Sequence, residues 1–111
     1  MQQMSLKKLN ELLGRTGRAL LFVKSDGCHL CHQFEPIVFS LQEEYRGDIE
    51  FFVCSDESPE VSDVFEEHIN GVPSIILLGA DDYFVVPDPE NPDPNSWYTR
   101  EYIDKFLKEW Q

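Results

Sequence analysis

The apolar residues of the chain fall into short runs that predict strands separated by helical segments. Three mostly apolar runs occupy residues 19–23, 49–54 and 75–78, and a fourth at residues 83–86 follows the third after a turn at residues 79–82. Apolar runs of this kind suit strands that are buried within a sheet. Their order predicts parallel strands joined by helices, followed by an antiparallel hairpin.

Apolar residues at helical spacing predict four helices, each with capping residues that mark its ends. The helix after the first strand contains Pro36, which should kink it. The last helix should pack an apolar face on the sheet, because its apolar residues recur every three or four positions. The first helix should run from Ser5 to Gly14, the second from the Cys28 turn to Gly47, and the third from Ser58 to Asn70-Gly71. Thr99 should cap the start of the last helix.

Residues 87–96 interrupt this pattern, because prolines alternate there with acidic residues. Such a stretch is too polar and too rich in proline for regular structure, so it predicts a separate loop. With 111 residues, the chain is long enough for one hydrophobic core and too short for two. We therefore expect a single domain over residues 1–111, with an N-terminal helix in residues 1–16 and a core in residues 17–111 that carries the 87–96 loop.

The formal net charge of −12 argues against binding of nucleic acid or an anionic membrane through a basic face. No apolar run is long enough to predict a membrane span, and the N-terminal residues lead into an amphipathic pattern instead of a signal-peptide core. The sequence therefore predicts a cytoplasmic monomer whose partners are neutral or basic, with no nucleic acid and no membrane among them.

The candidate chemistry is the Cys28-His29-Leu30-Cys31 segment, which lies between a predicted buried strand and a predicted helix. Free N–H groups and the partial positive charge of a helix start lower the pKa of a thiol there, and the thiolate is the form that attacks disulfides. The chain has three cysteines, an odd number that does not make a secreted disulfide framework. Cys54, on a predicted buried strand, is expected to be an inert apolar residue.

Two metal-type interpretations also fit the cysteine pair. Cys28 to His32 matches the CxxCH pattern of haem attachment, but the motif is flanked by strands and the only methionines, Met1 and Met4, offer no distal ligand. Cys28, Cys31 and His32 could supply three zinc ligands, but a structural site needs a fourth. The sequence therefore favours redox chemistry with neither a metal nor a cofactor.

Over residues 18–110 the order of these features resembles the thioredoxin superfamily. The four matching features are an apolar strand running into Cys28-His29-Leu30-Cys31, a helix with a proline five residues after the second cysteine, a strand-to-helix segment from Val53 to Glu60, and Gly71-Val72-Pro73-Ser74 before a strand and hairpin. The resemblance implies an α/β thioredoxin fold, with a central mixed four-stranded sheet flanked by helices and, in this chain, an extra N-terminal helix.

The resemblance also implies site roles. Cys28 would be the attacking thiolate and Cys31 the resolving thiol. Pro73 would be a cis proline beside the disulfide, and the backbone of Val72 would pair with an extended substrate peptide next to Gly27. The implied partners are protein disulfide substrates and an upstream dithiol reductase, and the implied activity is disulfide exchange, most simply as a reductase.

The chain departs from the thioredoxin pattern at several positions. Gly27 replaces a tryptophan, Phe22 replaces a buried acid and Phe52 replaces a lysine, so a base would have to be water or one of the side chains Asp26, His29 and His32. The His29-Leu30 pair replaces Gly-Pro, and a protonated His29 would favour the reduced form and make the disulfide more oxidising. Residues 79–82 lack the glutaredoxin pattern, which disfavours dependence on glutathione.

The 87–96 loop should lie near the active site, because the second strand of the hairpin runs back toward Pro73. Its carboxylates, Asp88, Glu90 and Asp93, would then oppose the helix dipole, raise the pKa of Cys28 and admit neutral or basic partners. The alternative to an enzyme is a binding module, in which the Val72-Pro73 segment and the acidic loop hold a partner and the redox chemistry is incidental.

Overall fold

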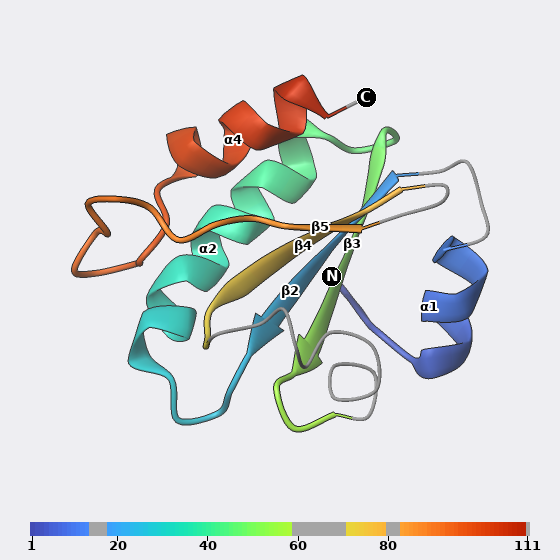
Figure 1. Ribbon diagram of the computed structural model, residues 1–111, viewed down its shortest axis with the longest axis horizontal. Helices are drawn as coiled ribbons and strands as arrows, with labels where there is room; N and C mark the ends of the chain where they lie inside the picture. Colours follow the sequence, from blue (N-terminus) through green and yellow to red (C-terminus); the bar gives the residue numbers. More distant parts are fainter. Residues whose placement is uncertain (14–17, 59–70, 80–82, 111) are drawn as a thin grey trace.

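A computed structural model describes residues 1–13, 18–58, 71–79 and 83–110 of the chain, and Figure 1 shows their arrangement. The helix expected after Ser58 lies outside these residues, as do Gly14 and the turn at residues 80–82. In chain order the elements are β1 (Gln2–Gln3), α1 (Leu6–Leu13), β2 (Arg18–Lys24), α2 (His29–Glu44), β3 (Ile49–Ser55), β4 (Ser74–Leu78), β5 (Tyr83–Val85) and α4 (Arg100–Glu109).

The strands form one mixed sheet in the order β1-β3-β2-β4-β5. β2 is parallel to β3, and β4 and β5 form the predicted antiparallel hairpin, with β4 antiparallel to β2. The class is α/β as expected, but the prediction of four strands is wrong. Residues 2–3 pair in parallel with Phe52 and Val53 as a fifth strand. Two exposed glutamines carry no apolar pattern, so β1 had no signal in the sequence.

β2 is the central strand of the sheet, between β3 and β4, and both of its faces are covered. Its apolar residues, 19–23, are at most 1% exposed. Leu20 and Phe22 join the apolar cluster beneath α2 and α4, whereas Leu21 and Val23 join the cluster beneath α1. Figure 1 shows α2 and α4 together on one side of the sheet and α1 on the other. The continuous apolar run is thus the signature of a strand between two layers.

Helix α2 begins at the cysteine pair, contains Pro36 and buries four side chains, those of Cys31, Phe34, Val38 and Leu41. The helix ends at Glu44, and the expected end at Gly47 is wrong by three residues. Tyr45 is the C-cap, and its N–H donates to the Leu41 carbonyl oxygen at 3.0 Å. Gly47 instead occupies the turn into β3, where its φ of +90° is a conformation that favours glycine.

The predicted N-terminal caps of the first and last helices are confirmed. Ser5 Oγ accepts a hydrogen bond from the Lys8 N–H at 3.1 Å, and Thr99 Oγ1 accepts one from the Tyr102 N–H at 3.2 Å. Each hydroxyl satisfies a backbone donor that has no partner within its own helix. Among the described residues, no helix has both the length and the apolar character that crossing a membrane requires.

Candidate active site

Cys28 and Cys31 form a disulfide at the start of α2, with their Cα atoms 5.2 Å apart. Cys28 is the N-cap of the helix, and its Sγ accepts a hydrogen bond from the Cys31 N–H at 3.0 Å. Cys28 is half-buried, whereas Cys31 is only 1% exposed. The pair therefore joins a partly accessible residue at the helix start to a residue held in the core.

The helix start favours negative charge on the Cys28 sulfur when the disulfide is open. The N-cap position directs a backbone N–H at the sulfur, and the first turn of this 16-residue helix contains no acidic residue. The helix macrodipole places partial positive charge at the same end. These are the surroundings in which a cysteine reacts as a thiolate.

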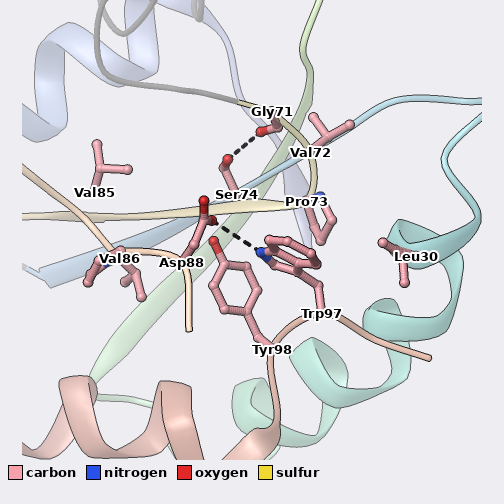
Figure 2. A pocket seen from close by; sticks show the side chains of 11 residues that line it. Leu30, Gly71, Val72, Pro73, Ser74, Val85, Val86, Asp88, Trp97 and Tyr98 are labelled. Carbon is pink, nitrogen blue, oxygen red and sulfur yellow. Dashed lines mark hydrogen bonds between the residues drawn. The ribbon is translucent and has the colours of Figure 1, made fainter. Parts of the chain in front are cut away.

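The Val72-Pro73 peptide bond is cis, the isomer that the resemblance implies. Pro73 is buried, and Ser74 Oγ next to it donates a hydrogen bond to the Gly71 carbonyl oxygen. A cavity of about 520 Å³, here called the Pro73 pocket, opens beside this turn. Its walls are Leu30 from α2, residues 71–74, residues 85–88, and Trp97 with Tyr98 (Figure 2).

The segment between β5 and α4 forms one side of the Pro73 pocket and is closed by hydrogen bonds. Asp93 and Trp97 form a two-bond backbone bridge, with N···O distances of 3.0 and 2.8 Å. The Trp97 indole Nε1–H donates to Asp88 Oδ1 at 3.1 Å, and the Tyr102 hydroxyl donates to the Pro87 carbonyl oxygen at 2.7 Å. The predicted loop thus lacks helix and strand but is tied to itself and to α4.

The acidic residues of the loop take different places. Asp88 lines both the Pro73 pocket and a neighbouring hollow beside α4, whereas Glu90 lines only the hollow. Burial raises the pKa of the Tyr98 phenol, and the Asp88 carboxylate adds to this rise. Asp93 accepts a hydrogen bond from the Asn95 N–H at 2.7 Å. Of the three carboxylates, Asp88 is therefore the one that faces the pocket.

The structure brings only some of the sequence-predicted site residues together. Leu30, Val72 and Pro73 line the Pro73 pocket beside the cysteine pair, whereas Gly27 does not. Gly27 is exposed, and a Cβ atom there would meet no atom within 4 Å, so the surface before Cys28 is open. His29 is exposed on the first turn of α2.

Of the two other candidate bases, the His32 ring contacts the backbone of Asp26. His32 Nε2 is 3.3 Å from the carbonyl oxygen of Asp26, and both residues are exposed. Within the described ranges, no three His, Cys, Asp or Glu side chains form a group that could hold a metal ion.

Sequence reasoning missed two features of this region. One is that Trp97 and Tyr98 line the pocket. They directly follow residues 87–96, and the irregular composition of that segment does not predict which residues it contacts. Lys24, at the end of β2, pairs with Glu35 of α2 at 3.0 Å, and both side chains are about one third exposed (32% and 30%). Glu35 follows Cys31 by one helical turn. A charged residue at the end of an otherwise apolar strand was the available signal for this pair.

Neither a protein-family model nor a curated protein matches the chain in sequence comparisons. The candidate site therefore rests on the chain's own features, namely a disulfide of CxxC spacing at a helix start in an α/β fold, and a pocket beside it.

Proposed function

We propose that the protein is a thioredoxin-like thiol–disulfide oxidoreductase that reduces protein disulfides through Cys28 and Cys31. The observation that carries the proposal is the asymmetry of the pair, with Cys28 half-buried at the N-cap and Cys31 almost fully buried one turn later. An accessible thiol that is activated, followed by a sheltered thiol within bonding distance, is what a two-step exchange needs.

The reaction begins with the reduced dithiol. The Cys28 thiolate attacks one sulfur of the client disulfide, so that a Cys28–client bond forms and the client disulfide breaks, and the released client thiolate takes a proton. Cys31 then loses its proton to water or a nearby base and attacks the Cys28 sulfur. The Cys28–Cys31 bond forms, the second client thiol leaves, and two electrons have passed to the client.

The Pro73 pocket supports a mode of client binding. Val72 precedes the cis proline at the edge of the pocket, and its backbone groups could pair with an extended client segment. Leu30, between the two cysteines, lines the same pocket, so a segment bound there lies next to the reactive disulfide. Backbone pairing would let the protein accept many client sequences.

The cycle closes when an upstream dithiol reductase returns two electrons to the Cys28–Cys31 disulfide. The pair carries the electrons itself, so the proposal invokes no cofactor. A reductase of this kind would work in the cytoplasm, where disulfides are kept reduced.

The first test is the redox midpoint of the pair. The protein is equilibrated in defined dithiol buffers, and free thiols are alkylated and counted by mass spectrometry. A reversible two-electron couple near about −270 mV supports a reductase, whereas a value of about −150 mV or above indicates an oxidant or isomerase. Absence of a reversible couple would overturn the redox function.

That last outcome would favour the alternative, a binding module with incidental redox chemistry. Replacing Cys28 with serine separates the two classes, because an enzyme loses turnover whereas a binding module keeps its partner. The pocket beside the cysteine pair is the feature that a binding module would use.

A further inference from the structure

We infer that Asp88 and Trp97 select client segments that carry an arginine or lysine next to the reactive cysteine. The inference rests on the proposed function and names its substrate class. It concerns the wall of the Pro73 pocket that the segment between β5 and α4 supplies, which carries Asp88, Trp97 and Tyr98 (Figure 2).

Position is the first argument. Leu30, Asp88 and Trp97 line the same pocket. The cysteines themselves do not line the pocket, but Leu30 lies between them in the sequence, so a client cysteine that bonds to Cys28 brings its neighbouring residues toward the pocket. A side chain that enters the pocket can then contact Asp88 and Trp97.

The chemistry of the wall suits a cation. Asp88 is exposed, and the hydrogen bond from Trp97 Nε1 occupies only one of its several acceptor positions. Among the residues that the structure describes, no ion pair involves Asp88. The indole of Trp97 adds an aromatic face, and tryptophan is the best aromatic partner for a guanidinium or ammonium group.

The wall is formed before a client arrives. Trp97 has a φ of +66°, which is unusual for a residue with a side chain, and the two-bond bridge to Asp93 holds its backbone there. The indole is fixed in turn by its bond to Asp88 at 3.1 Å. Since these groups are already ordered, binding a client side chain costs little further ordering of the protein.

Charge complementarity decides which client fits. The 87–96 segment contains three carboxylates and neither lysine nor arginine, in a chain with a formal net charge of −12. A basic client side chain gains attraction from Asp88, and an acidic one meets repulsion. An exposed ion pair together with an exposed cation–π contact is worth about a threefold to tenfold preference.

The test uses matched peptide disulfides. In each, a short peptide with one cysteine is linked to a constant second peptide, and the residue on either side of the cysteine is arginine, glutamine or glutamate. The reduced protein is mixed with each disulfide, the reaction is quenched with acid, and products are counted by mass spectrometry. Each rate constant is divided by that of dithiothreitol with the same peptide, which removes the effect of charge on the disulfide itself.

We expect the arginine peptide to react about threefold to tenfold faster than the glutamine peptide, and the glutamate peptide to react slowest. Asp88→Asn keeps an acceptor for the Trp97 indole and should reduce the arginine preference to below about twofold. Glu90→Gln is the matched control, because it removes the same charge from the same segment outside the pocket, and it should keep the preference. Circular dichroism verifies that both variants are folded.

The outcomes separate the inference from the proposed function. Equal rates for all peptides overturn the inference and leave the oxidoreductase standing. If Asp88→Asn leaves the arginine preference intact, the preference comes from the overall charge of the protein, and the inference is also overturned. If the protein reduces none of the peptides while dithiothreitol reduces them all, the proposed function fails, and the inference fails with it.

Discussion

The two cysteines differ in burial, and this difference predicts different outcomes when each is replaced. Cys31→Ser should leave Cys28 able to attack but unable to be released, so a mixed disulfide with the client accumulates. Cys28→Ser should form at least about tenfold less mixed disulfide than Cys31→Ser, because the remaining Cys31 is only 1% exposed. Mass spectrometry after incubation with a peptide disulfide measures both. Equal adduct formation by the two variants would contradict the assigned order of attack.

Phe34 is one of the four buried side chains of α2. It is fully buried, packs edge-to-face on Phe22 with ring centres 5.6 Å apart, and contacts Tyr98 at 5.3 Å. Phe34→Ala should lower the free energy of unfolding by about 3–5 kcal/mol, because it leaves a cavity between the sheet and α2. Urea unfolding provides the measurement.

The control for Phe34 is Phe39 on the same helix, which is 46% exposed. Phe39→Ala should change the free energy of unfolding by no more than about 0.5 kcal/mol. If both variants lose a similar free energy of unfolding, the cause would be the change in helix propensity or a contact made by Phe39. It would then not be the cavity left by Phe34.

At the scale of residues, the sequence predicts what local chemistry determines. Cys28 at a helix start and Thr99 as a cap follow from patterns within a few positions, and both are confirmed. Trp97 could not be found in this way. Its place in the pocket depends on the backbone bridge to Asp93 and on a cis proline more than twenty positions away. A periodic pattern of apolar residues does not predict a contact between residues so far apart in the sequence.

Among the elements, α2 and α4 are joined by a hydrogen bond that should make stability depend on pH. The Tyr45 hydroxyl donates to Asp104 Oδ1, and this bond is the main cause that holds the pKa of Asp104 below its ordinary value of 3.8. A carboxyl group with a lowered folded pKa stabilises the fold above its unfolded pKa, and that contribution is lost as pH falls below 3.8.

Tyr45→Phe should therefore lower the free energy of unfolding by about 1 kcal/mol at pH 6, and by less than half of that near pH 2.5. Urea unfolding at both pH values measures the difference. The matched control is Tyr102→Phe, since the Tyr102 hydroxyl donates to the Pro87 carbonyl oxygen, which does not titrate. Its cost should be equal at the two pH values. A cost of Tyr45→Phe that does not change with pH would contradict the role given to Asp104.

Elements with an apolar pattern were predicted well, and those fixed by distant contacts were not. The central strand and the β4–β5 hairpin follow from apolar runs and a turn. β1 has no such run and exists because β3 offers a free edge to residues 2–3. The sequence predicts that α2 ends at Gly47, yet the helix stops at Glu44, since the positive φ that favours glycine occurs later, in the turn.

On the scale of the whole molecule, the excess of acidic residues should oppose folding. The chain has 21 acidic and 9 basic residues, and the four ion pairs of the described residues are partly or well exposed, as in Arg46–Glu43 with 77% and 67% exposed side chains. Exposed pairs contribute little, so repulsion among the remaining carboxylates should dominate. Salt that screens this repulsion should then stabilise the fold.

Raising NaCl from about 0.02 M to about 0.3 M should increase the free energy of unfolding on the order of 1 kcal/mol, and the Tm by about 5 °C. The same salt should slow reduction of the arginine peptide severalfold, because it screens the attraction to Asp88 and the acidic surface. Added salt should thus raise the stability of the fold while it lowers the rate of reduction of the arginine peptide. A general effect of salt on the fold would not change the two in opposite directions. A fall in stability would mean that the ion pairs outweigh the repulsion. A constant rate would mean that charge does not guide the client.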